Sequence, residues 1–397
     1  MIVSHSPDNG YLVPRGVMKS TANTDEDFPA LTSLRGLAAL GVVLFHIDVC
    51  LFYREMGTLL PKAASGLIAN GYLWVDFFFI LSGFVIHHAY RDRLASGPRW
   101  RSTVDYYRAR FFRIYPLHLI LTGVLVLTVV VAGALAPGLK DGSWDAFFKP
   151  SALLANLLMF HAMTPGAGLT WNIVSWSIAA EWWVYAVAPL LIPLLAGGGT
   201  KASWACMGLG CVILVSLYIL IGRDTLDITY DWGVIRGLGG FLIGLGLYRI
   251  SDAVQRQPGW MADAIAAMAL LGLGWVMQTD ANDLLAIAPF VLLVLVGTCR
   301  EGLFHKFLRQ RIPIYLGRIS YSIYLVHGLV FMLFWFGAPA LGLTFRHPAA
   351  AWGFALVFGG LTIGLAALTY RYIEQPGQRL GRQIALRNSG SLVRPQE

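Results

Sequence analysis

One stretch, LTSLRGLAALGVVLFHIDVCLFY at residues 31–53, most constrains what this chain can fold into. It is long and apolar enough to cross a bilayer as one helix. It nevertheless holds Arg35 and His46, which a rise of about 1.5 Å per residue places roughly 16 Å apart along the axis. With Arg35 at one membrane face, His46 lies near the middle. An ionisable side chain there is costly, so His46 is either functional or a buried histidine bonded to a neighbouring helix.

The composition extends this interpretation to the whole chain. Of 397 residues, 56% are apolar or aromatic and only 13% are charged, whereas a soluble domain carries about 25% charge. We therefore predict an all-α, polytopic integral membrane protein with little length left for a soluble domain. About ten transmembrane helices are expected, near residues 31–53, 67–90, 114–136, 173–196, 203–222, 231–250, 261–278, 284–299, 314–336 and 350–372.

The basic residues predict the orientation in the membrane. If the N-terminus is inside, 23 of the 30 Lys and Arg lie on the cytoplasmic side, 6 lie outside, and Arg236 lies within a span. This excess is the pattern that orients membrane proteins, so both termini are predicted to be cytoplasmic and the protein to lie in the inner (plasma) membrane. The same clustering explains the net charge of +8 without a nucleic-acid partner.

The predicted domain organisation is simple. Residues 1–28 are expected to be a disordered cytoplasmic tail, residues 29–376 the membrane domain, and residues 377–397 a basic cytoplasmic tail. Four cysteines lie in or beside apolar spans, with no spacing typical of a metal site or a disulfide framework. We therefore predict no metal.

Four ionisable residues are predicted to share one depth. His46 and His327 fall near the middle of their spans, and Asp76 and Glu181 lie roughly 13 Å from the outer face by helical rise. Arg236 is expected to enter less deeply. Several ionisable groups at one level, contributed by different helices, indicate a reaction chamber or an ion path.

The chemistry expected of this chamber is proton transfer. His46 is the candidate general base, and a carboxylate would hold its tautomer and stabilise the imidazolium. Glu181 is preferred over Asp76 for that role. The remaining candidates are predicted to bind substrate: Ser177, one helical turn from Glu181 on the same face, with Trp176, Arg236 and His327.

A second group of candidates lies at the predicted inner face. Arg35, Arg110 and Arg113 adjoin the starts of apolar helices, where a phosphate can sit beside helix N-termini. The planar fork of arginine suits phosphate better than lysine does, so these three are predicted to bind a phosphorylated ligand. The other inner arginines, including Arg318 and Arg371, are attributed to orientation and lipid headgroups. Separately, Ser82-Gly83-Phe84 is typical of close helix packing.

Six segments in order resemble the integral-membrane acyltransferase 3 family, bacterial O-acyltransferases of sugars and related acceptors. They are LTSLRGLAALGVVLFH, WVDFFFILSGFVI, RARFFRIYP, WSIAAEWWVY, YLGRISYSIYLVHGLV and YRYIEQP, spread over residues 31–376.

The resemblance implies transfer of an acyl group, usually acetyl, from cytoplasmic acyl-CoA to a hydroxyl of a carbohydrate acceptor, such as a cell-surface or exported polysaccharide or its lipid-linked precursor. It assigns catalysis to Arg35 and His46, and donor handling to Arg110 and Arg113.

Two other functions remain open at this point. A transporter of a sugar, lipid or acid would use the same intramembrane charges as a proton relay. A lipid-binding or sensing protein would tolerate loss of His46.

Overall fold

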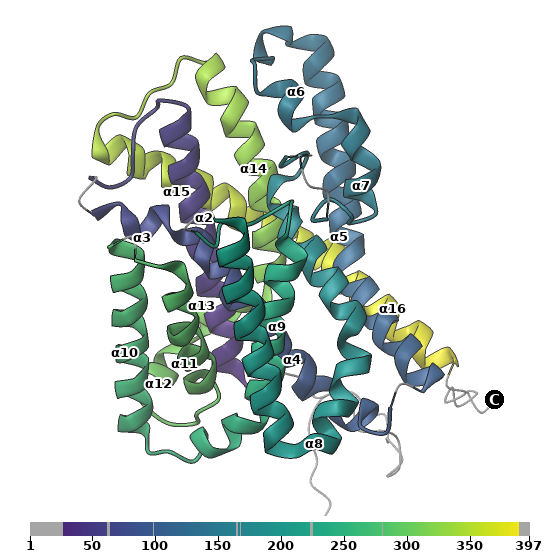
Figure 1. Cartoon of the computed structure of the whole chain (residues 1–397). Helices are drawn as coiled ribbons and strands as arrows, with labels where there is room; N and C mark the ends of the chain where they lie inside the picture. The colour runs from purple at the N-terminus through teal and green to yellow at the C-terminus, as the bar shows by residue number, and fades with distance from the viewer. Residues whose placement is uncertain are drawn as a thin grey trace, which may run out of the picture.

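The computed structural model describes residues 27–388, apart from 62–63, 98, 164–165, 167, 223–224 and 280. These residues form helices and connecting loops, without a β-strand among them (Figure 1). Eight helices are long and apolar enough to cross a membrane. The prediction of an all-α, multi-pass membrane protein is therefore supported. The predicted disordered tail at residues 1–28 lies almost wholly outside the described residues.

The α-helices are α2 (Pro29–Tyr53), α3 (Gly66–Ala69), α4 (Trp74–Leu94), α5 (Trp100–Leu135), α6 (Trp144–Phe147), α7 (Leu153–Leu157), α8 (Trp176–Ile221), α9 (Gly233–Val254), α10 (Gly259–Gln278), α11 (Ile287–Gly297), α12 (Leu303–Leu308), α13 (Arg311–Arg318), α14 (Ser320–Ala340), α15 (Pro348–Thr369) and α16 (Gln375–Asn388). Short 3₁₀ turns cover Gly71–Leu73, Pro137–Leu139, Pro150–Ala152, Ile173–Ser175 and Asp283–Ala286, and a π-helical turn covers Tyr370–Glu374.

The predicted count of ten spans is not confirmed, because two of the ten lie within a single helix and a third is represented by a short helix. Helix α8 includes both 173–196 and 203–222, with a break at Gly199, whose φ of 63° and ψ of −150° suit only glycine. Trp176 and Leu214 both contact the N-terminal half of α9, whereas Ser203 contacts its C-terminal half. The helix therefore doubles back, and its two arms meet at the bottom of Figure 1. The predicted span 284–299 is represented by α11, which has 11 residues.

Helices α4 and α9 cross in close contact. A Cβ at Gly83 would lie 2.1 Å from the carbonyl oxygen of Phe241, and one at Gly244 would lie 1.8 Å from that of Ile80. No larger residue fits without separating the two backbones. The predicted packing site at Ser82-Gly83-Phe84 is therefore confirmed.

A second close crossing positions the first candidate residue. Helix α2 passes α13 so tightly that a Cβ at Gly36 would lie 2.5 Å from the Gly317 nitrogen. Arg35, the neighbour of Gly36, is thereby held beside the junction of α13 and α14.

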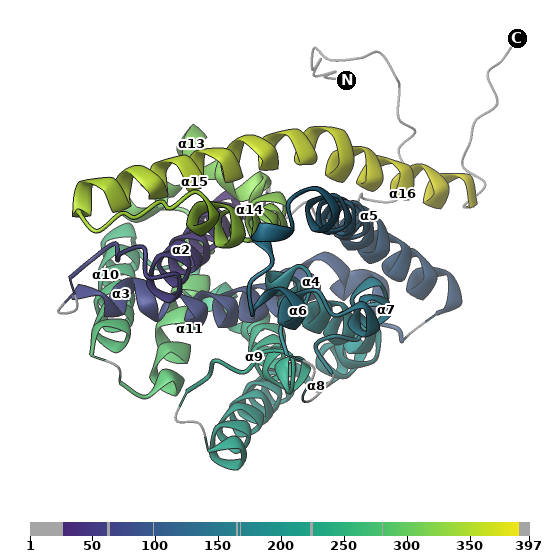
Figure 2. The same cartoon turned by 90° about the horizontal axis from the view of Figure 1, so that it is seen from above.

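The C-terminal helices run on without a break past residue 376, where the predicted cytoplasmic tail begins. Helix α15 continues through the π-helical turn at Tyr370–Glu374 into α16, forming the long rod along one side of Figure 2. Gly377 and Gly381 let α16 pack against Pro116 and Phe112 of α5. Residues 377–388 are thus a packed helix, and residues 389–397 lie outside the described part.

Candidate functional site

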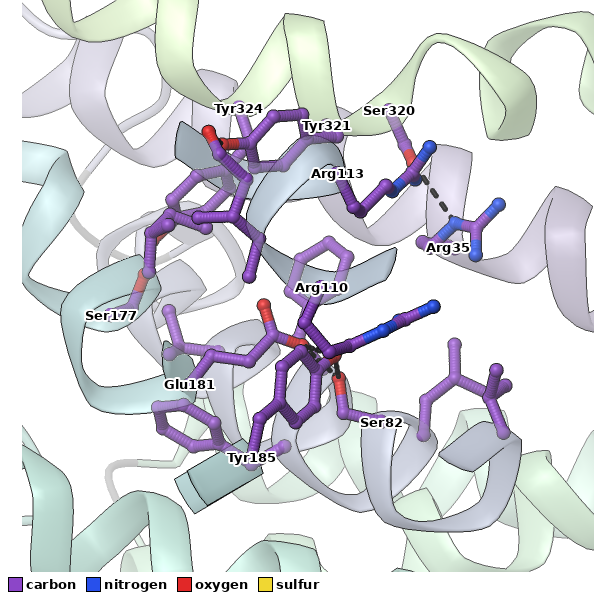
Figure 3. Close-up of a pocket in the computed structure, with 17 residues that line it drawn as sticks. Arg35, Ser82, Arg110, Arg113, Ser177, Glu181, Tyr185, Ser320, Tyr321 and Tyr324 are labelled. Atoms are coloured by element: carbon purple, nitrogen blue, oxygen red, sulfur yellow. Dashed lines mark hydrogen bonds between the residues drawn. The ribbon is translucent and has the colours of Figure 1, made fainter. Parts of the chain in front are cut away.

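A cavity of about 110 Å³ lies among α2, α4, α5, α8 and α14. A space of this size suits a group of a few heavy atoms. Figure 3 shows its polar lining, which comprises Arg35, Ser82, Arg110, Arg113, Ser177, Glu181, Tyr185, Ser320, Tyr321 and Tyr324. The fold therefore brings together the three arginines that the sequence singled out, and adds Ser177 and Glu181 from α8.

Arg35 is anchored at the junction of α13 and α14. Its Nε donates to the Ser320 hydroxyl at 3.0 Å (Figure 3). One terminal nitrogen donates to the Gly317 carbonyl at 3.2 Å. The close crossing of α2 and α13 brings the Arg35 side chain within hydrogen-bond distance of both groups. Arg35 is thereby fixed at the edge of the cavity.

Arg110 and Arg113 sit one helical turn apart on α5 but have different partners. A terminal nitrogen of Arg113 lies 2.5 Å from Oε1 of the buried Glu374. Arg110 instead lies over the rings of Tyr90 and Tyr185, with its Cζ 5.6 Å from each centroid. It forms no ion pair with any residue that the structure describes. Its charge is stabilised by aromatic faces and remains available to an anion.

Glu181 belongs to the cavity wall. Its Oε1 accepts hydrogen bonds from the Ser82 hydroxyl and the Tyr185 hydroxyl, which also lie 3.2 Å apart. The predicted common face of Ser177 and Glu181 is confirmed, since both line the cavity.

Among the described residues, no carboxylate contacts His46, so the prediction of Glu181 or Asp76 in that place is wrong. Its Nδ1 lies 3.0 Å from the carbonyl oxygen of Val42, one turn earlier on α2, and 3.3 Å from Nε2 of His327. The two imidazole rings are 4.9 Å apart and inclined by 64°. A backbone carbonyl and a second histidine therefore contact Nδ1 of His46, where a carboxylate was expected.

Asp76 is held elsewhere, by Arg236. Its two oxygens accept from Nε of Arg236 at 2.9 Å and from a terminal nitrogen at 2.7 Å, and both side chains are at most 1% exposed. The predicted span 67–90 breaks into α3, a 3₁₀ turn and α4, so Asp76 lies in the first turn of α4. There the helix dipole also favours a carboxylate.

The same cluster contains another predicted substrate-binding residue. The Trp176 ring lies 5.5 Å from Cζ of Arg236, and the Ile228 carbonyl accepts from the guanidinium at 3.2 Å. Trp176 and Arg236 therefore share a closed ion-pair cluster with Asp76, apart from His46.

Tyr324 connects the cavity with the histidine pair. Its hydroxyl lies 2.7 Å from the Ser177 hydroxyl, and its ring lies 5.3 Å from the His327 ring. Sequence reasoning missed Tyr324 and Ser320. Their spacing relative to His327 could have revealed them, because Ser320, Tyr324 and His327 occupy positions i, i+4 and i+7 on one face of a helix. Sequence reasoning also missed Glu374, which lies in the segment YRYIEQP.

Comparison with known proteins identifies the family. A family model described as an acyltransferase domain matches residues 28–371. The acyltransferase MdmB of Streptomyces mycarofaciens is 29% identical over 89% of this chain and 92% of its own length. The exopolysaccharide production protein ExoZ of Rhizobium meliloti is 29% identical over 78% of this chain and 90% of its own length.

A more distant relative is the O-acetyltransferase OatA of Staphylococcus aureus, 23% identical over 89% of this chain and 57% of its own length. No solved structure matches. The family match spans α2 to the π-helical turn and so includes every residue of the cavity. The chain belongs to the acyltransferase 3 family and is a multi-pass membrane O-acyltransferase.

Proposed function

We propose that this protein transfers an acetyl group from cytoplasmic acetyl-CoA to a hydroxyl of a carbohydrate, such as a cell-surface or exported polysaccharide or its lipid-linked precursor. The observation that carries the proposal is the cavity, which is bordered by Arg35, Arg110 and Arg113 and is adjoined through Tyr324 by the His46–His327 pair. Its volume of about 110 Å³ suits a short acyl group. The names of OatA and ExoZ support an acetyl donor and a polysaccharide acceptor, respectively.

The arginines are assigned to the donor. Coenzyme A carries phosphates, which guanidinium groups bind through paired, charge-assisted hydrogen bonds. Arg110 is the strongest candidate because its charge has no ion-pair partner among the described residues, whereas Arg113 already contacts Glu374. The thin pantetheine arm then extends between the helices and carries the thioester toward His46.

His46 is assigned the role of general base. The Val42 carbonyl can only accept, so it selects the tautomer with a proton on Nδ1 and leaves a lone pair on Nε2. Nε2 removes the proton from the acceptor hydroxyl as that oxygen attacks the thioester carbonyl. The new C–O bond forms, the C–S bond breaks, and the proton passes from Nε2 to the departing sulfur.

A cytoplasmic donor requires the arginine-lined cavity to be reached from the cytoplasmic side of the inner membrane. Reporter fusions after Gly142 and Gly342 should therefore read outside, and fusions after Arg99 and Arg309 should read inside, following the positive-charge bias. Compartment-specific reporter activity in intact cells measures this. An external reading at Arg99 would place the arginine-lined cavity on the wrong side for cytoplasmic acyl-CoA.

The donor assignment predicts an effect on affinity. Arg110→Ala should raise the KM for acetyl-CoA about 10- to 100-fold, because one charge-assisted interaction with phosphate is lost. Arg110→Lys should restore it in part, since a point charge lacks the guanidinium fork. CoA release and product formation in membrane vesicles measure both.

The matched control is Arg101→Ala, which removes an exposed arginine of the same helix that does not line the cavity. It should leave the KM for acetyl-CoA unchanged. If the KM for acetyl-CoA is unchanged in Arg110→Ala as well as in Arg101→Ala, Arg110 is assigned to membrane orientation. The main support for a CoA donor is then removed.

A further inference from the structure

The pairing of His46 with His327 has a defined direction. Two atoms face the Nδ1 atom of His46: the Val42 carbonyl oxygen at 3.0 Å and Nε2 of His327 at 3.3 Å. Because a carbonyl oxygen cannot donate, Nδ1 must carry the proton. The His46 N–H is therefore available to both neighbours at once.

His327 is oriented to accept from that N–H. The residue is 0% exposed, and Nε2 is the ring nitrogen that faces His46, 3.3 Å from its Nδ1. Since Nδ1 of His46 carries the proton, Nε2 of His327 must present a lone pair for these two atoms to form a hydrogen bond.

The ring of His327 is also held in place by its surroundings. The next residue, Gly328, is pressed against Asn172, so closely that a Cβ there would lie 2.0 Å from the Asn172 Oδ1. The Asn172 amide nitrogen donates to the Leu325 carbonyl at 3.2 Å. This turn of α14 is thus fixed from outside the helix, and with it the direction in which His327 points.

We propose that His327 is the positioning residue for His46. Nε2 of His327 accepts a hydrogen bond from the Nδ1–H of His46, and it stabilises the imidazolium that forms when Nε2 of His46 takes the proton of the acceptor hydroxyl. This inference rests on the proposed role of His46 as base. A neutral imidazole in this place performs the orienting task usually given to a carboxylate, and it avoids burying another negative charge in the membrane.

The test compares substitutions of His327 in the full-length protein in vesicles. His327→Phe keeps a planar ring but cannot accept, and should lower kcat about 10- to 100-fold with the KM for acetyl-CoA unchanged, as expected for one hydrogen bond to a charged group. His327→Gln presents an acceptor near the position of Nε2 and should stay within about threefold of the wild-type kcat. Membrane abundance is measured in the same preparations.

Two controls separate the possible causes. Met332→Leu changes another buried residue of α14 that lies outside the cavity lining and should behave as wild type. His327→Leu is a second variant without an acceptor, used if the Phe variant does not accumulate. An active His46→Ala protein would refute the proposed base itself. If His46→Ala is inactive, two results would overturn the positioning role alone. One is a wild-type kcat in His327→Phe or His327→Leu, and the other is an equal loss of kcat in His327→Gln and His327→Phe.

Discussion

His46→Ala should insert into the membrane at normal abundance, yet lose acyl transfer by about 100- to 10,000-fold, the usual contribution of a positioned general base. His46→Gln should lose as much, because an amide can replace a hydrogen bond but cannot take up a proton. Transfer to carbohydrate and CoA release, measured together in vesicles, report the reaction. Acetyl-CoA binding should persist in both variants, since the arginines are untouched.

A purely structural His46 gives the opposite order of effects. His46→Gln would then be nearly normal, and His46→Ala would accumulate poorly because a packed ring is lost. The matched control is His347→Ala, which removes an exposed histidine at the start of α15. An active His46→Gln enzyme at normal abundance would refute the proposed base.

Arg236→Ala should destabilise the protein by about 3–5 kcal/mol, because it leaves Asp76 charged, buried and unpaired. Asp76→Ala should do the same by stranding the Arg236 guanidinium. Both variants should show reduced abundance in the membrane and a lower temperature of thermal aggregation in detergent. The expected effect is large because both side chains are almost completely buried.

The double variant Asp76→Leu, Arg236→Met distinguishes packing from catalysis. Replacing both members of a buried ion pair with apolar residues is often neutral, so abundance should recover and activity per folded molecule should stay near wild type. A stable but inactive double variant would instead assign Asp76 to the reaction, as the sequence had suggested.

Several features could be predicted from the sequence because they depend on distances along the chain. The apolar content and span lengths predicted a helical, multi-pass membrane protein, and the six ordered segments predicted the family. The sequence also grouped Arg35, Arg110 and Arg113, because each adjoins the start of an apolar segment, and all three line the cavity. Each of these features depends only on the composition, order and spacing of residues along the chain.

Only the tertiary structure decided which side chains meet. Depth along the membrane normal placed His46, Asp76, Glu181 and His327 at one level, but not on facing helix surfaces. Helix rotation and crossing assigned Asp76 to Arg236, Glu181 to Ser82 and Tyr185, and His46 to His327. The glycine contacts that set those crossings, and the reversal of α8 at Gly199, depend on packing between distant segments, which spacing within one segment does not encode.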